Sequence, residues 1–589
     1  MRVLIIAAVI VAGMAGVAVA AEQKLPGSDI IPAERLADWR PGVTVGVPGG
    51  IPTDRDKLID VTKEPYNADK TGQTDASAAI QQAIKDAKDK EVVYLPAGTY
   101  RTDKTIGMGK SNITLRGDGP EKTVILPQCQ HAISIVGRPG GSDWWYANRL
   151  RLSITGSPKR GSTELTVGDT KALKVGDICQ LRLMNDPKVP VIAPAHWEYM
   201  QRQESRIVAK TETTVTISPG LLYDLPESLS PQLAPCGGHA DFVGIEDLAV
   251  DGKDGKAVVG VQMNAAYGCW LKNVKVVNIR NYHVSLGDSV QCEIRHCTIA
   301  KRLLSGSNGA GILFGTSSSC LIEDNILLEQ FPHLEANAAT GNVFAYNFCK
   351  DSSIFEGDFG LEGCSIGTNH GAQSCYNLYE GNVSPKLQSD GYHGGSSYDT
   401  VFRNWLHGTD EKTNNFWICI NLNRFTRYYS IVGNVLGKKG YAWIYDNCDE
   451  GFLGGGYEQH FIYLLGMPGM GNIAFNGQRV QPSKGKNWPD WDKMIAAEPG
   501  KGPGPNGFGE LDLDVAATTI RLGNYNYKDN GVPESESLKG AKLPKSLYLT
   551  EKPKWFGKLA WPPFGPDTEF EKNKIPAQVR FEAMTKSAK

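Results

Sequence analysis

Short runs in which apolar and polar residues alternate recur along most of the chain, and they predict many short β-strands rather than long helices. Two clear runs lie at residues 92–100 and 111–117, with turn-forming residues between them. One stretch has helical spacing instead. Its apolar residues at 79–87 stand three and four apart behind Thr74 and Asp75, which are residue types that cap a helix. The pattern therefore predicts an all-β protein with an N-terminal capping helix.

A longer repeat is visible between residues 240 and 440. An apolar pair, a polar pair, a turn-forming residue and a second apolar pair recur there. The turn-forming positions are Asp247, Asn273, His296, Asn325, Asn347, Asn382, Asn404 and Asn434. Their spacings of 26, 23, 29, 22, 35, 22 and 30 residues are typical of a solenoid whose coils keep their strands and take insertions into loops. Asparagine suits such corners because it tolerates left-handed backbone, and its amide can bond its counterpart in the next coil.

The N-terminal motifs resemble those of a known family. The helix at 79–87, the run Val-Val-Tyr-Leu-Pro-Ala-Gly-Thr-Tyr from Val92, and the run Ser-Asn-Ile-Thr-Leu-Arg-Gly-Asp-Gly from Ser111 precede the Asn-rich coils. This order resembles the right-handed parallel β-helix proteins of the pectate lyase superfamily, over roughly residues 55–480. The resemblance implies the fold. It leaves the reaction open, since that superfamily contains lyases, hydrolases, epimerases and phage tailspikes.

The ends of the chain and one internal region depart from the repeat. The first twenty residues have a charged start, an apolar run and a small-residue end at Ala18-Val19-Ala20, which is the order of a secretory signal. The C-terminal region has too few periodic apolar residues for a core of its own. The expected parts are a signal peptide (1–20), an N-terminal extension (21–54), a parallel β-helix (55–480) with an inserted small β-subdomain (about 151–225), and an extended C-terminal segment packed on the β-helix (481–589).

Composition narrows the possible partners and the compartment. The 62 basic and 64 acidic residues nearly balance, so we expect no nucleic-acid partner. Only 12 cysteines occur in 589 residues, which is too few for a disulfide-held scaffold, so most should be buried thiols. Beyond the signal no apolar segment is long enough to span a bilayer, so we expect no membrane insertion. The sequence predicts a secreted or periplasmic monomer.

Acidic and imidazole side chains concentrate between residues 330 and 410. They occur at nearly the same distance, eight to eleven residues, after three of the repeated Asn positions. Stacked coils would place such residues in one column, with neighbours about 4.8 Å apart. The column contains His333, Glu335, Glu356, Asp358, Asp390 and His393.

Two reactions fit this column. Paired carboxylates on successive coils have the separation that glycosidases use, so Asp358 and Asp390 could hydrolyse a glycosidic bond. Alternatively, His393 could be the base of a β-elimination, with Arg403 holding the substrate's carboxylate. His370 stands beside either arrangement as a further catalytic candidate.

A cation is the one cofactor that the pattern suggests. Glu356, Asp358 and Asp390 could together bind calcium, because hard cations prefer clustered oxygen ligands. The side chains expected to contact substrate are His333, Glu335, Tyr392, Trp405, His407 and Trp417.

The sequence as a whole therefore predicts a secreted enzyme that cleaves an acidic polysaccharide, as a glycoside hydrolase or a polysaccharide lyase. A solenoid suits that substrate because its long face repeats one binding geometry from coil to coil. The alternative is a non-catalytic carbohydrate-binding or cell-surface β-helix protein.

Overall fold

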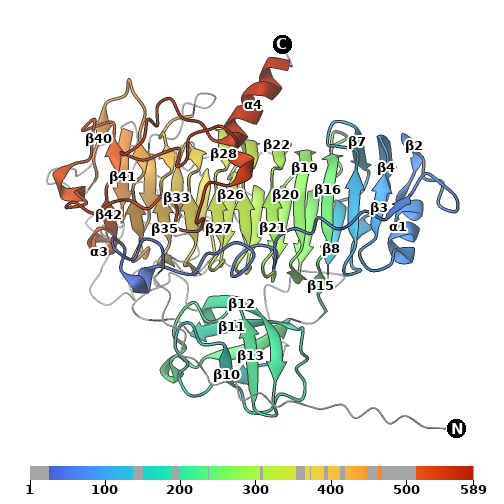
Figure 1. The fold of residues 1–589 in the computed structure, drawn as a ribbon, viewed down its shortest axis with the longest axis horizontal. Helices are drawn as coiled ribbons and strands as arrows, with labels where there is room; N and C mark the ends of the chain where they lie inside the picture. The colour runs from blue at the N-terminus through green and yellow to red at the C-terminus, as the bar shows by residue number, and fades with distance from the viewer. Residues whose placement is uncertain are drawn as a thin grey trace, which may run out of the picture.

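The computed structural model describes twelve stretches of the chain. They are residues 25–136, 150–184, 186, 199–236, 238–304, 309–352, 365–371, 373–390, 395–410, 418–447, 460–466 and 512–587. The predicted signal peptide at 1–20 lies outside them. Within these stretches the molecule is a long solenoid of parallel strands with a smaller β-sheet unit attached along one side (Figure 1). The right-handed parallel β-helix predicted from the sequence is confirmed.

One wall of the solenoid is an eleven-stranded parallel sheet, called here the narrow sheet. Each strand pairs with its equivalent in the preceding and following coils, for example β23 with β26 and β26 with β29. Its strands are β5 (Ile106–Gly107), β8 (His131–Val136), β17 (Val259–Asn264), β20 (Tyr282–Gly287), β23 (Ala310–Gly315), β26 (Leu334–Asn337), β29 (Ile366–Asn369), β33 (Leu387–Ser389), β37 (Ile418–Leu422), β40 (Trp443–Ile444) and β41 (His460–Leu465).

The other walls form a continuous sheet of 22 described strands, called here the large sheet. Most coils contribute two strands to it, separated by a short corner. The strands are β1 (Leu58–Asp60), β2 (Thr71–Asp75), β3 (Val92–Leu95), β4 (Gly98–Thr102), β6 (Thr114–Gly117), β7 (Thr123–Pro127), β16 (Gly244–Asp251), β19 (Trp270–Ile279), β21 (Glu293–Arg295), β22 (Thr298–Arg302), β24 (Leu321–Glu323), β25 (Ile326–Gln330), β27 (Val343–Ala345), β28 (Phe348–Ser352), β31 (Leu378–Glu380), β32 (Val383–Ser384), β35 (Thr400–Phe402), β36 (Trp405–Leu406), β38 (Ser430–Val432), β39 (Val435–Leu436), β42 (Ile520–Leu522) and β43 (Tyr525–Asn526).

The remaining elements lie outside the two parallel sheets. The inserted unit is an antiparallel sheet of β9 (Leu152–Ser153), β10 (Glu164–Thr166), β11 (Ile178–Met184), β12 (Tyr199–Lys210), β13 (Thr214–Ser218) and β14 (Gln232–Cys236). Two-residue strands pair at other corners, as β15 (Ala240–Asp241) with β18 (Ala266–Tyr267) and β30 (Ser374–Cys375) with β34 (Ser396–Ser397). The helices are η1 (Ala33–Arg35), α1 (Ser77–Asp86), η2 (Glu227–Leu229), α3 (Leu513–Thr518), η4 (Glu534–Glu536), η5 (Lys554–Phe556) and α4 (Pro576–Ser587).

Inside the solenoid, apolar side chains of equivalent strand positions stack on one another. The column Ile294, Ile322, Phe344, Tyr379, Val401 and Ile431 passes through six paired strands and is fully buried. The rings of Phe344 and Tyr379 stack with their centroids 5.0 Å apart. Each coil therefore buries its apolar side chains against those of its neighbours, and no coil has a separate core.

From the coil of Asn325 onward, a buried ladder of asparagines occupies the corner between the two strands of the coil. The Nδ2 of each of Asn325, Asn347, Asn382, Asn404 and Asn434 donates to the Oδ1 of the next member at 2.9–3.0 Å. The last acceptor is Asn524, whose own Nδ2 donates to the buried Glu536 at 2.8 Å. The expected amide contact between coils is present.

The left-handed backbone, however, lies one residue earlier than expected. It occurs at Asp324, Tyr346, Gly381, Arg403 and Gly433, each directly before a ladder asparagine. Asp247, Asn273 and His296 have this left-handed conformation, so they are equivalent to Asp324 and not to Asn325. The predicted alignment was therefore wrong by one residue at its first three positions.

Segments from both ends of the chain cover the outside of the large sheet (Figure 1). The N-terminal extension is held by Trp39, whose Nε1 donates to the carbonyl of Tyr376 at 2.9 Å. In the C-terminal region β42 and β43 pair with β38 and β39 as one further coil, so the solenoid extends beyond residue 480. After that coil the chain runs back along the sheet to α4.

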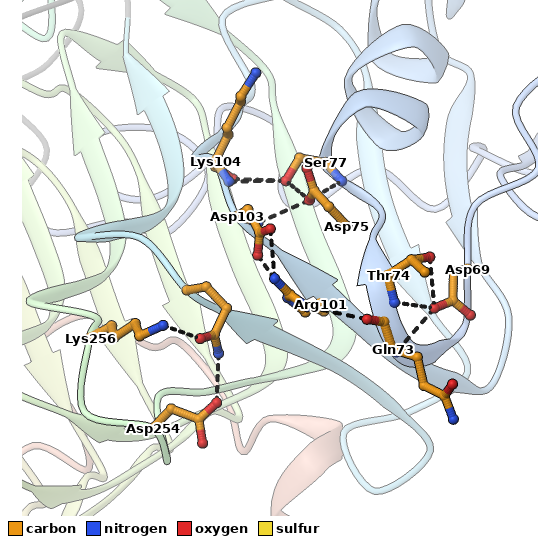
Figure 2. Close-up of polar contacts among 11 residues, drawn as sticks. Asp69, Gln73, Thr74, Asp75, Ser77, Arg101, Asp103, Lys104, Asp254 and Lys256 are labelled. Atoms are coloured by element: carbon orange, nitrogen blue, oxygen red, sulfur yellow. Dashed lines mark hydrogen bonds and ion pairs between the residues drawn. The ribbon is translucent and has the colours of Figure 1, made fainter.

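The helix α1 lies at the opposite end of the solenoid, where Ile80, Ala83 and Ile84 enter the core cluster. Polar contacts hold this end together, as Figure 2 shows. The carboxylate of Asp75 accepts hydrogen bonds from the backbone nitrogens of Ser77 and Asp103, both at 2.9 Å. Asp75 therefore links the start of α1 to the strand β4, which ends just before Asp103.

We expect that Asn404→Ala lowers the free energy of unfolding by about 3 kcal/mol. The substitution removes the acceptor for the backbone and side-chain nitrogens of Asn382, and the donor to Tyr379 and Asn434, all in a buried corner. Urea unfolding measures the change. The partly exposed Asn281→Ala is the control, with an expected loss below about 1 kcal/mol. Equal losses of unfolding free energy in the two variants would contradict a stabilising role of the asparagine ladder.

Candidate functional site

The structure brings Glu335, His370 and Asp390 together on the narrow sheet. Glu335 lies in β26 between the buried residues Leu334 and Ala336, so its side chain points away from the core. His370 directly follows β29 and Asp390 directly follows β33. One polar atom from each of the three side chains lies within 4.8 Å of the other two. Three consecutive coils thus each supply one residue of the cluster, and the first and last of these residues, Glu335 and Asp390, are 55 positions apart in sequence.

The imidazole of His370 lies between the two carboxyl groups. Its Nδ1 is 2.5 Å from Oδ2 of Asp390 and 3.9 Å from Oε1 of Glu335. Burial alone would lower the pKa of His370, but the charges of Asp390 and Glu335 outweigh it and raise the pKa to about 9. His370 is therefore an imidazolium ion at neutral pH.

The pKa of Glu335 is also raised, which for a carboxyl group favours the uncharged form. Burial raises the pKa of its carboxyl group to about 7, with the charge of Asp390 adding to the rise and that of His370 opposing it. A large fraction of Glu335 is therefore protonated at neutral pH, and a protonated carboxyl group is what a general acid requires. Only 15% of its side chain is exposed, against 37% for His370 and 19% for Asp390.

Buried amides surround the cluster, and some of their atoms have no hydrogen-bond partner among the described groups. These atoms are Oδ1 of Asn337 and Oε1 of Gln388. Asn337 lies two residues after Glu335, and its Oδ1 packs against Gly371, beside His370. Gln388 is two residues before Asp390 in β33. Unpaired amide oxygens of this kind are suited to accept hydrogen bonds from the hydroxyl groups of a ligand. The sequence analysis missed both residues, although both lie in strands of the narrow sheet beside cluster residues.

Two predicted site residues have structural roles instead. His333 is fully buried, its Nε2 donates to the carbonyl of Lys350 at 3.0 Å, and its Nδ1 lies 3.0 Å from the hydroxyl of Ser365. It joins the narrow sheet to β28 and has no surface for substrate. Arg403 is 1% exposed and bonds both carboxylate oxygens of Asp567 in the C-terminal segment, at 2.7 and 2.8 Å. Both side chains are covered, which argues against the catalytic role predicted for Arg403 and the substrate contact predicted for His333.

Trp405 and His407 lie away from the cluster, on the other side of the solenoid corner. The ring of Trp405 packs edge-on against Phe564 and Phe570 of the C-terminal segment. Both predicted residues line a pocket beside β28 and β36. The remaining predicted residues lie outside the described residues. They are Glu356, Asp358, Tyr392, His393 and Trp417.

The same three side chains could also hold a metal ion. Two carboxylates and an imidazole suit a transition metal better than calcium, which prefers oxygen ligands throughout. A proton on His370 competes with such an ion, because a ligand nitrogen must be deprotonated. Of the residues predicted to bind calcium, Asp390 belongs to this cluster, and Glu356 and Asp358 lie outside the described residues.

Residues 60–152 match a family model described as rhamnogalacturonase A/epimerase, pectate lyase-like. The match lies in the region whose motifs predicted the resemblance to the pectate lyase superfamily, and that prediction is confirmed. No curated protein matches the chain significantly.

Among solved structures, the tailspike gp61 of Pseudomonas phage phi297 is 13% identical, with a TM-score of 0.44 over 64% of this chain and 70% of that chain. The tailspike gp49 of Pseudomonas phage LKA1 is 14% identical, with a TM-score of 0.43 over 64% of this chain and 70% of its own. The DFA-IIIase of Arthrobacter chlorophenolicus A6 is 12% identical, with a TM-score of 0.36 over 64% and 84% of the two chains.

The described part of the chain is a parallel β-helix, and residues 60–152 are similar to the family described as rhamnogalacturonase A/epimerase, pectate lyase-like. The family description names polysaccharide-active enzymes. In the part of the chain that the structure describes, no helix has both the length and the apolar character needed to cross a bilayer.

If Arg403 is structural, replacing it should reduce stability and leave catalysis intact. We expect Arg403→Leu to lower the free energy of unfolding by about 3 kcal/mol, because it leaves Asp567 and the backbone carbonyls of Pro544 and Phe564 without their donor. Urea unfolding measures the loss of stability. The value of kcat, measured under conditions in which the variant is folded, shows whether catalysis is unchanged. Arg40→Ala, which breaks an exposed ion pair with Asp38, should cost at most about 1 kcal/mol. A stable R403L protein with a much lower kcat would restore the catalytic assignment.

Proposed function

We propose that this protein is a glycoside hydrolase that cleaves a polysaccharide at the Glu335–His370–Asp390 cluster. The observation that carries the proposal is the pair of carboxyl groups of Glu335 and Asp390, which have oxygens within 4.8 Å of each other, with the pKa of Glu335 raised to about 7. Glycosidases that retain anomeric configuration use two carboxyl groups about 5 Å apart in two different protonation states.

Each group then has one role. Glu335 donates its proton to the glycosidic oxygen as the bond to the anomeric carbon breaks, which releases the leaving sugar as an alcohol. The carboxylate of Asp390 attacks that carbon and forms a glycosyl ester. Glu335, now a carboxylate, takes a proton from water, and the resulting hydroxide displaces Asp390 and restores both groups. His370 is a positioning residue, since its hydrogen bond orients Asp390.

The charge of His370 makes this residue unsuited to act as the base of a β-elimination. Elimination needs a base that removes the proton at C5 of a uronic acid, and an imidazolium ion has no lone pair to accept it. The raised pKa of His370 keeps it protonated up to about pH 9. The same positive charge favours an acidic polysaccharide, because it can attract a uronate carboxylate near the reacting bond.

The family description makes galacturonate-containing polysaccharides the first substrates to test. The proposed location of the enzyme is outside the cytoplasm, either secreted or periplasmic, and it rests on the signal-type sequence at residues 1–20.

We expect Glu335→Gln and Asp390→Asn each to lower kcat by about a thousandfold, because they remove the acid and the nucleophile. Reducing ends released from rhamnogalacturonan, polygalacturonan and neutral polysaccharides measure the activity, and absorbance at 235 nm detects elimination. Ser285→Ala is the matched control, since Ser285 pairs with Leu313 and Leu313 with Glu335 in one row across the narrow sheet. Its kcat should stay within about twofold of the parent's.

The pH profile supplies a second readout. Activity should fall as pH rises through about 7, because Glu335 then loses the proton that it donates. An increase in absorbance at 235 nm would show that the reaction is elimination and not hydrolysis. No cleavage of any polymer in a wide panel would favour the non-catalytic alternative.

A further inference from the structure

A pocket of about 180 Å³ lies where the large sheet meets the helix α4, away from the proposed catalytic cluster. Phe348, Val383 and Trp405 form its apolar lining, and Gln578 of α4 is the one lining residue from that helix. We propose that this pocket binds a single pyranose unit of a saccharide and so gives the protein a second carbohydrate site. The inference rests on the proposed function only for the choice of sugars as the ligand class.

Gln578 has an amide oxygen that lacks a partner. Its Oε1 is buried and has no hydrogen bond to any described group. The helix that carries it is held firmly, because Arg580 donates to the buried Asp324 and Phe581 packs on Phe348 with ring centroids 5.1 Å apart. A buried carbonyl oxygen fixed in this way costs free energy unless a donor reaches it. A sugar hydroxyl is such a donor.

The shape and lining of the pocket suit a sugar ring. A cavity of about 150 Å³ is known to hold a six-membered ring, whereas drug-sized ligands fill about 300 Å³ or more. The pocket therefore has room for one pyranose and not for an oligosaccharide. Trp405 contributes an aromatic surface, and its Nε1 is already engaged by the carbonyl of Gly437 at 3.1 Å. The indole is thus available as an apolar contact for the C–H face of a ring.

The polar residues that line the pocket include both hydrogen-bond donors and acceptors, and both positive and negative charges. Those called here the polar rim are Lys350, Asp351, His407, Asp410 and Lys438. Lys350 pairs with Asp351 at 2.6 Å, and Asp410 accepts the backbone N–H of Ser352 at 2.8 Å. Two ammonium groups and two carboxylates leave no large excess of charge, so the rim is suited to hydroxyl groups rather than to a phosphate or a metal ion.

The pocket lies across a solenoid corner from the wall that carries the catalytic cluster. His333 stands two residues before Glu335 and donates to the carbonyl of Lys350, a rim residue. A polysaccharide lying on the narrow sheet could therefore place a side branch or a distant unit in the pocket. Such a site would hold the polymer without taking part in bond cleavage.

Saturation-transfer NMR and calorimetry on the full chain test the proposal. The probes are the methyl glycosides of galactose, galacturonic acid, glucose and rhamnose. We expect at least one to bind, Gln578→Ala to weaken that binding about fivefold or more, and Gln578→Phe, which fills the pocket, to abolish it. Val579→Ala on the exposed face of the same helix should leave binding unchanged, and so should E335Q, which removes the proposed acid.

Absence of binding by every probe at millimolar concentration would overturn the proposal, as would unchanged binding in both Gln578 variants. Loss of binding in E335Q would place the sugar at the catalytic cluster instead. Because binding is measured without turnover, a protein that cleaves no polymer but binds a glycoside through Gln578 would contradict the proposed hydrolase and support the pocket.

Discussion

The fixed register between successive coils is the constraint on which the rest of the structure depends. Parallel strands stack about 4.8 Å apart, so a residue meets its equivalents only if every coil has the same corner in the same place. The buried amides from Asn325 to Asn434 ensure this, because each one donates to the asparagine of the next coil, and the last acceptor is Asn524. A shift by one residue would break these bonds and turn the strand side chains to the opposite face.

The fold could be predicted because this constraint leaves a trace in the sequence. Ladder asparagines recur at the corners from Asn325 onward, and their spacing revealed those coils. The prediction placed Asn273 and His296 one position out, since both positions of a corner accept polar residues and only coordinates distinguish a left-handed residue from a ladder amide. The last coil was missed because Asn524 follows Asn434 by 90 residues, an interval that hides the repeat.

The candidate site was predictable only in part. Glu335 and Asp390 were assigned to one column from their distance to the ladder, and the structure places both, with His370, in one cluster. The sequence did not reveal which outer faces are covered. Arg403 has the chemistry of a substrate-binding cation, but Asp567, 164 residues later, lies over it. Covering by a distant segment leaves no local pattern, so it could not be read from the residues around Arg403.

Three consecutive coils bring the imidazolium of His370 between the carboxyl groups of Glu335 and Asp390. An NMR titration of ¹³C-labelled histidine, with the resonance of His370 assigned by its loss in His370→Gln, tests this most directly. The account predicts that the pKa of His370 is about 9 and that Asp390→Asn lowers it toward the ordinary value. If the pKa of His370 is about 6.5 and does not change in the Asp390→Asn variant, the coils do not bring these groups together.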